Sequence, residues 1–115
     1  MLQKALDFLK SHKEVAFATC EGGRPHIRVF QIMKQEGATL YFATSPEKRV
    51  FRQLQDNPCI EVMASSDNVF VKCSGRADFA VGEAAARWIY DHNPVLPRLY
   101  SSWDKLACFR LAVEQ

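Results

Sequence analysis

The sequence lacks several features that mark common classes of protein. No hydrophobic run approaches the ~20 residues of a membrane-spanning helix, and residues 1–8 mix charged and apolar positions, unlike a signal peptide. The five glycines are not spaced as in a dinucleotide-binding fingerprint or a phosphate-binding loop. No Cys-x-x-Cys pair occurs among the four cysteines, and the three histidines are scattered. We therefore expect no membrane span, Rossmann-type domain, nucleotide triphosphatase or metal site, and we expect a soluble cytoplasmic protein.

The chain also carries little net charge. Fifteen Lys and Arg against thirteen Asp and Glu leave a formal charge of +2, which is too small to favour a nucleic-acid or membrane partner. With 115 residues there is room for one domain, and eight Phe, two Trp and three Tyr argue against disorder. A domain of this size has a thin core, so pairing with a second copy of the chain would help to stabilise it.

The hydrophobic periodicity predicts a chain rich in strands. Two glycines followed by proline indicate a tight turn between the first two strands, which therefore form a hairpin. Six strands joined mostly by tight turns, with a helix inserted in the middle, predict a mostly β fold, an antiparallel β-barrel with α-helices. The expected helices are 2–12, one from 45–47 to 56–58, and 82–92; the expected strands are 15–20, 26–33, 39–43, 59–64, 69–79 and 106–113.

The helix expected after residue 44 has a cationic face. We expect Ser45 to cap this helix and Pro46 to occupy its first turn. Backbone N–H groups at its N-terminus, beside the hydroxyls of Thr44 and Ser45, form a candidate anion site, best suited to phosphate. A solvated basic face with a serine cap is the alternative. The basic face comprises Lys48, Arg49 and Arg52, and the opposite apolar face comprises Val50, Phe51 and Leu54.

Arg28 is a second candidate for anion binding. It lies between apolar neighbours, Ile27 and Val29, in the second strand of the hairpin. A cation in such a strand either points to solvent or meets a ligand, and both alternatives remain open. Because the third strand leads directly into the basic helix, Arg28 and Arg24 could converge on the anion held there.

Taken in order, these segments resemble a known family. Val15 to Phe30, Leu40 to Ser45, Lys48, and Gln53 to Pro58 are similar to the pyridoxamine 5′-phosphate oxidase-like flavin-binding split barrels. The nearest branch is the short one that includes the nitroimidazole-reductase-related proteins. The resemblance covers nearly the whole chain and implies a single domain over residues 1–115, a six-stranded antiparallel split β-barrel of the FMN-binding type.

The resemblance also implies a cofactor and its site. Members of the family form a homodimer that binds FMN at the subunit interface. By this resemblance, the strand backbone beside Arg28 meets the polar edge of the flavin, and Lys48 is the cationic partner of the phosphate. The implied cofactor-binding residues are Arg28, Val29 and Phe30 along the flavin, Thr44 and Ser45 at the phosphate, Lys48, and Arg49 as an assisting base.

Three functions remain open at this stage. The first is an FMN-dependent oxidoreductase that passes hydride from a reduced nicotinamide to a small-molecule acceptor. No general acid or base is identified, but flavin carries its own hydride chemistry. The second is a flavin-binding protein without turnover, serving storage, electron transfer or sensing. The third is a small-barrel nucleic-acid module, which the low net charge and the confinement of the basic residues to one helix disfavour.

Some side chains have two interpretations. Tyr100 and Trp103, in the loop before the last strand, could stack on the flavin ring or pack a subunit interface. His26 shares a strand face with Arg28 and would look towards the flavin if Arg28 does. The cysteines lie in apolar stretches, where a free thiol behaves as a small hydrophobe; they are Cys20, Cys59, Cys73 and Cys108.

Overall fold

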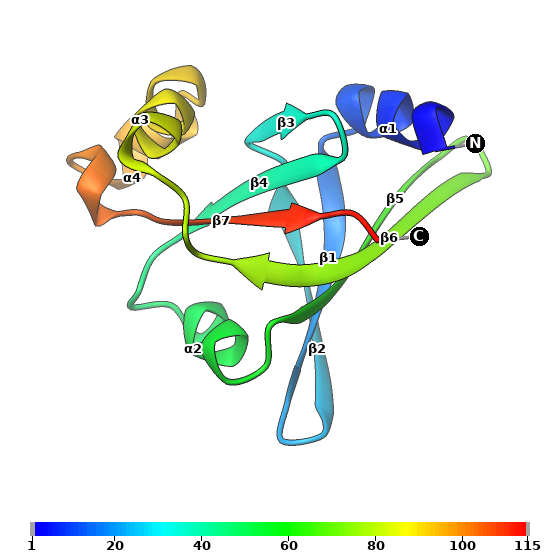
Figure 1. Cartoon of the computed structure of the whole chain (residues 1–115), viewed down its shortest axis with the longest axis horizontal. Coiled ribbons are helices and arrows are strands. Elements are labelled where there is room, and N and C mark those ends of the chain that lie inside the picture. The colour runs from blue at the N-terminus through cyan, green and yellow to red at the C-terminus, as the bar shows by residue number, and fades with distance from the viewer. Residues whose placement is uncertain (1, 115) are drawn as a thin grey trace.

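A computed structural model describes residues 2–114 of the chain. Its strands are β1 (Glu14–Glu21), β2 (Arg24–Gln31), β3 (Lys34–Glu36), β4 (Thr39–Thr44), β5 (Cys59–Ser66), β6 (Val69–Asp78) and β7 (Ala107–Ala112). Its helices are α1 (Leu2–Ser11), α2 (Arg49–Asp56), α3 (Glu83–His92) and α4 (Val95–Leu99), with a 3-10 turn η1 (Trp103–Lys105). The strands form one curled antiparallel sheet in the order β2-β1-β5-β6-β7-β4-β3 (Figure 1).

The architecture confirms the expected split barrel, with one strand more than the six expected. The extra strand is β3, which pairs with β4 across a turn at Gly37, whose φ is +55°. Lys34, Gln35 and Glu36 are all polar, so this short strand has no apolar alternation by which the sequence could reveal it. The other strands and helices α1 and α3 lie within a few residues of their expected bounds.

The hairpin of β1 and β2 forms because its turn contains two glycines. Gly22 and Gly23 have φ angles of +56° and +79°, which a two-residue hairpin turn of the favoured hand requires. The resulting register places Phe17 opposite Arg28. In the order of the sheet β2 is an edge strand, and the hairpin extends beyond the other strands (Figure 1). One side of the β2 backbone therefore has no neighbouring strand within the described residues.

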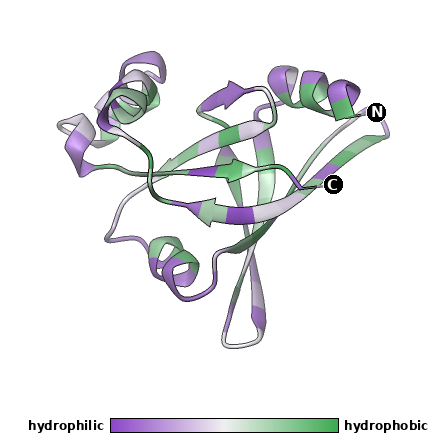
Figure 2. Ribbon diagram, viewed as in Figure 1, coloured by the Kyte–Doolittle hydropathy of each residue, from purple (hydrophilic) through white to green (hydrophobic). Residues whose placement is uncertain are grey.

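Aromatic side chains fill the centre of the curled sheet. Phe17, Phe42 and Phe109 are completely buried, and the Phe17 ring packs edge-on against the other two, with centroids 5.2 and 5.8 Å away. Helix α1 closes one end of this core with Leu6 and Leu9, while its charged positions face outward (Figure 2). Burial of such large rings is the main stabilising contribution to the fold.

Helix α2 begins later than the sequence predicts. Residues 45–48 form a turn instead, in which the Lys48 N–H donates to the Ser45 carbonyl at 3.0 Å. The Ser45 hydroxyl accepts the N–H of Glu47 at 3.2 Å, and Lys48 itself is extended. The expected serine cap with Pro46 in the first helical turn is therefore wrong. Proline is equally suited to the second position of a β-turn, and this alternative prevails here.

The segment between β6 and β7 contains more structure than the prolines suggest. Helix α3 begins after Gly82, and α4 and η1 follow where the sequence predicts only a loop. Ile89 and Leu96 are buried against Tyr41 of β4, so packing on the sheet stabilises these short helices. Over residues 2–114, no helix is long and apolar enough to cross a membrane.

An ion pair between β6 and β7 makes the stability depend on pH. The Ala80 backbone N–H and the Arg110 guanidinium both donate to the Asp78 carboxylate and hold its pKa below the usual 3.8. As the pH falls, the unfolded chain takes up this proton first, so the pair stabilises fully above about pH 4 and progressively less below it. The urea midpoint should be lower at about pH 2 than at about pH 6, and we expect this difference to be smaller in Asp78→Asn than in the wild type. Parallel wild-type and variant curves would contradict this.

Candidate functional site

The Arg28 side chain is bound within the protein. Its Nη1 donates to the Thr19 hydroxyl at 2.8 Å and to the Phe17 carbonyl at 3.3 Å. Its Nη2 donates to Oε1 of Gln53 in α2 at 2.7 Å, and the same oxygen accepts the Thr19 hydroxyl at 2.7 Å. Arg28 thus crosses β1 and joins the hairpin to α2, which neither of the two alternatives drawn from the sequence anticipates.

A carboxylate extends this network towards the surface. Gln53 is only 1% exposed, and its Nε2 donates to Glu21 Oε1 at 3.3 Å. The same oxygen lies 3.5 Å from the Arg49 guanidinium and 3.7 Å from His26 Nε2. Partial burial lowers the pKa of Arg28 from its ordinary value, but the guanidinium stays charged at neutral pH. Arg28, Arg49 and His26 are therefore brought together through Gln53 and Glu21.

The turn between β4 and α2 holds the second part of the site. Thr44 and Ser45 are buried, with 3% and 6% of their surface exposed. The Thr44 hydroxyl has no hydrogen-bond partner within the described residues, although it is shielded from solvent. Lys48 is exposed and forms no ion pair in the described part of the chain, unlike Arg49. A buried hydroxyl without a partner is unusual, because buried polar groups normally find partners.

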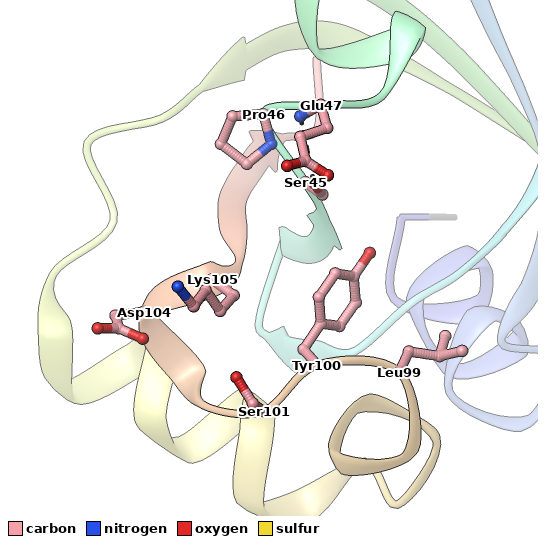
Figure 3. Close-up of a pocket in the computed structure, with 8 residues that line it drawn as sticks. All are labelled: Ser45, Pro46, Glu47, Leu99, Tyr100, Ser101, Asp104 and Lys105. Carbon is pink, nitrogen blue, oxygen red and sulfur yellow. Dashed lines mark hydrogen bonds between the residues drawn. The ribbon is translucent and has the colours of Figure 1, made fainter.

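A cavity opens on this turn. It measures about 390 Å³, and Ser45 and Glu47 form one wall while residues of the α4–η1 segment form the other (Figure 3). An overlapping cavity of about 450 Å³ adds Lys48 to the same lining. The Tyr100 ring points into the space beneath the turn (Figure 3). The lining of the first cavity comprises Ser45, Pro46, Glu47, Leu99, Tyr100, Ser101, Asp104 and Lys105.

Tyr100 and Trp103, the two aromatic residues before the last strand, lie in different surroundings. Tyr100 lines the cavity, and its carbonyl accepts the hydroxyl of Tyr90 at 2.7 Å. Trp103 packs instead beside α3, where the Arg87 guanidinium lies 4.7 Å from its ring centroid. Trp103 therefore packs within its own chain, its place at a subunit interface stays a prediction, and Tyr100 remains a candidate ligand contact.

The three consecutive residues 28–30 do not share one surface. The Val29 side chain is 66% exposed on the outer face of the sheet, whereas Arg28 turns to the inner face. Phe30 packs against the core, with its ring centroid 4.7 Å from that of Phe17. A single ligand therefore cannot contact all three side chains, and what they offer in common is the backbone of an edge strand.

Sequence reasoning did not identify Gln53, Thr19 and Glu21 as members of this network. One pattern could have revealed Gln53. It lies three residues after Val50 and one before Leu54, so a helix places its amide on the buried face between them. A polar side chain there requires buried partners. Thr19 and Glu21 carry no comparable pattern, because their role depends on which strand α2 packs against.

Comparison with known proteins identifies one family and a relative in Bacillus subtilis. The family model for pyridoxamine 5′-phosphate oxidase matches residues 1–99. General stress protein 26 of Bacillus subtilis (strain 168) is 30% identical over 100 residues, which is 87% of this chain and 67% of that protein.

Two solved structures have the same fold as this chain. A NimC/NimA family protein from Clostridium acetobutylicum superposes with a TM-score of 0.81 at 25% identity, over 96% of this chain and 78% of its own. An FAD-binding protein from Mesorhizobium loti superposes with a TM-score of 0.76 at 18% identity, over 98% of this chain and 89% of its own.

Proposed function

This chain belongs to the pyridoxamine 5′-phosphate oxidase family, and we propose that it binds FMN and acts as a flavin-dependent oxidoreductase. Its substrates are a reduced nicotinamide as hydride donor and a small-molecule acceptor. One of the proteins that share its fold is described as binding FAD. Our choice of FMN rests on a candidate site arranged around a single phosphate.

The turn after β4 carries the proposal. The Thr44 hydroxyl is a buried donor without a partner in the described residues, and a phosphate oxygen would supply the missing acceptor. Ser45, the next residue, lines the cavity, and Lys48 brings a positive charge that forms no ion pair within residues 2–114, although Glu47 lines the same cavity. Charge-assisted hydrogen bonds of this kind suit a phosphate. Arg49 plays the smaller part, because it already contacts Glu21.

The edge of the sheet supplies the place for the ring. Alternate backbone N–H and C=O groups of β2 face away from β1, and they match the polar edge of an isoalloxazine. Arg28 is then a positioning residue, because its guanidinium joins β2 to α2 and so fixes the ring edge relative to the phosphate turn. When bound, FMN supplies the hydride chemistry.

We further propose that two copies pair across the part of the outer face where Val29 of β2, Ala16 of β1 and Met63 of β5 lie, away from the Cys20 end of β1. Ile27, Val29 and Met63 are 73%, 66% and 39% exposed there. The registers place Val29, Ala16 and Met63 side by side, so these residues form one apolar stripe. A second copy would bury the stripe and cover a flavin on the edge strand.

An absorption spectrum tests the cofactor. The purified protein, loaded with FMN and freed of excess, should show the absorption bands of one bound flavin per subunit. Its molecular mass in solution, measured by light scattering, should be that of two chains. Steady-state oxidation of NADH or NADPH with varied acceptors then separates an enzyme from a carrier of flavin. A protein that retains no flavin would overturn the proposal, whereas bound flavin that no nicotinamide reduces would leave the non-catalytic alternative.

Two substitutions test the phosphate site. Lys48→Ala should weaken FMN binding by about 1.5–3 kcal/mol, because a charge-assisted contact is lost. Thr44→Val should weaken binding about tenfold but should not lower the urea midpoint, because it removes a hydroxyl that has no partner among residues 2–114 of the apoprotein. Lys72→Ala is the control for loss of positive charge, because Lys72 lies in β6 and lines neither cavity at the turn; its FMN affinity should not change. Unchanged FMN affinity in both site variants would place the phosphate elsewhere.

A further inference from the structure

Two cysteines of neighbouring strands fall at matching register positions, two residues beyond the last pair of their ladder. Strands β1 and β5 pair in a register that matches Phe17 with Val62 and Ala18 with Glu61. Continuing this register by two residues places Cys20 opposite Cys59, and both residues lie within their strands. Both thiols are free.

The two thiols also share one face of the sheet. Thr19 and Ile60 are buried in the interior, so the adjacent Cys20 and Cys59 project to the outer face. Both line one groove of about 570 Å³. Cys59 is exposed and Cys20 half-buried, so these two do not pack in the core as the expectation of small hydrophobes suggests.

The backbone geometry suits a covalent link. Residues directly opposite in an antiparallel pair have Cα atoms about 4.5–5.5 Å apart, within the roughly 4.4–6.8 Å that disulfides span. The Arg76 guanidinium donates to Cys59 Sγ at 3.6 Å and places a positive charge beside a sulfur that must become an anion to attack a disulfide. The remaining cysteines are buried, and burial raises the pKa of the Cys108 thiol to about 11.

We propose that Cys20 and Cys59 form a redox-active dithiol, which low-molecular-weight disulfides oxidise to an intramolecular crosslink between β1 and β5. The Cys59 thiol loses its proton to solvent, and its sulfur attacks the small disulfide, forming a mixed disulfide and releasing one thiolate. The Cys20 sulfur, also deprotonated, then attacks Cys59 Sγ and releases the second thiolate. Two protein thiols are oxidised, one small disulfide is reduced to two thiols, and no flavin is needed.

The crosslink would act on the candidate site. Thr19 and Glu21 flank Cys20, and both belong to the network that holds Arg28 and Gln53. A covalent bond at Cys20 therefore restrains the strand segment on which that network depends.

A peptide map under non-reducing conditions tests the crosslink, because trypsin places the four cysteines in separate peptides. Cys20 falls in residues 14–28, since the Arg24–Pro25 bond resists cleavage, and Cys59 falls in 53–72; Cys73 and Cys108 fall in 73–76 and 106–110. The whole protein is incubated with oxidised glutathione, denatured and alkylated. We expect one crosslinked species that joins 14–28 to 53–72, with the other two peptides alkylated.

Single substitutions separate the steps of the exchange. Cys20→Ser should accumulate a glutathione adduct on 53–72, because the resolving thiol is missing. In Cys59→Ser, Cys20 should form its glutathione adduct more slowly than Cys59 does in Cys20→Ser, because Cys20 is the less exposed thiol. Separate adducts on both peptides of the wild type, a link between two copies of 53–72, or four unreacted thiols would each overturn the proposal.

Discussion

Replacing Gly75 with alanine is expected to destabilise the protein by about 3 kcal/mol or more, among the largest effects of a single added methyl group. A Cβ at this position would lie 2.7 Å from the Ala112 carbonyl oxygen and would also overlap the Leu111 side chain. Leu111 is completely buried and belongs to the core, so neither it nor the β7 backbone can move aside cheaply. Gly75 lies close to the point where β6 passes from one partner to the other, since β5 pairs with β6 as far as Arg76 and β7 pairs with it at Ala77 and Asp78.

Urea unfolding measures this effect. The matched control is Gly82→Ala, at a glycine where an added Cβ meets nothing within 4 Å. Gly82 is the N-cap of α3, where alanine is less favourable than glycine, so the free energy of unfolding should fall by only about 0.5–1 kcal/mol. A stable Gly75→Ala protein with an unchanged midpoint would mean that the two halves of the sheet are not pressed together at this position. If the variant does not fold, its far-ultraviolet circular dichroism will show this directly, in agreement with the expectation.

Gln53→Leu is expected to cost about 3 kcal/mol of stability, although leucine fills nearly the same volume. The amide oxygen of Gln53 accepts hydrogen bonds from both Arg28 and Thr19. Its removal leaves a partly buried guanidinium and a buried hydroxyl without their acceptor. The loss of such an acceptor near a charged group is more damaging than the loss of an ordinary surface hydrogen bond.

Two control variants separate the loss of the buried acceptor from other effects of replacing a glutamine in α2. Gln55→Leu lies on the exposed side of α2, so its urea midpoint should change little. Gln53→Glu keeps an acceptor for Arg28 and should recover part of the loss, although it sets a second carboxylate beside Glu21. FMN affinity should fall with Gln53→Leu, since Arg28 no longer joins β2 to α2. A variant as stable as Gln55→Leu would show that Arg28 does not depend on this acceptor.

Much of the candidate site could be predicted from local patterns. The basic and apolar faces of α2 follow from helical spacing, and Val50 and Leu54 are buried while Arg49 and Arg52 are exposed. The start of the helix could not be fixed in the same way. Ser45 and Pro46 suit a helix cap and a β-turn alike, and the choice depends on how the chain leaves the sheet after β4.

Arg28 shows the limit of the local patterns more clearly. Its neighbours Ile27 and Val29 indicate a strand, and this was confirmed. The position of its guanidinium depends on α2, which two strands, β3 and β4, separate from it in the sequence, and on the burial of Gln53 on that helix. The residue pattern of neither β2 nor α2 predicts that contact.

The sequence by itself determined the family, the mostly β architecture and the order of the main elements, because these depend on short-range periodicity, turn residues and a run of segments in a recognisable order. Only the tertiary structure decided which side chains meet. Within residues 2–114 the Thr44 hydroxyl has no hydrogen-bond partner, and Arg28 donates to Gln53. The β1–β5 register, continued by two residues, matches Cys20 with Cys59, because strands far apart in the chain pair side by side. Register and docking are set by the packing of the whole core, and each of these residues taken alone is compatible with several partners.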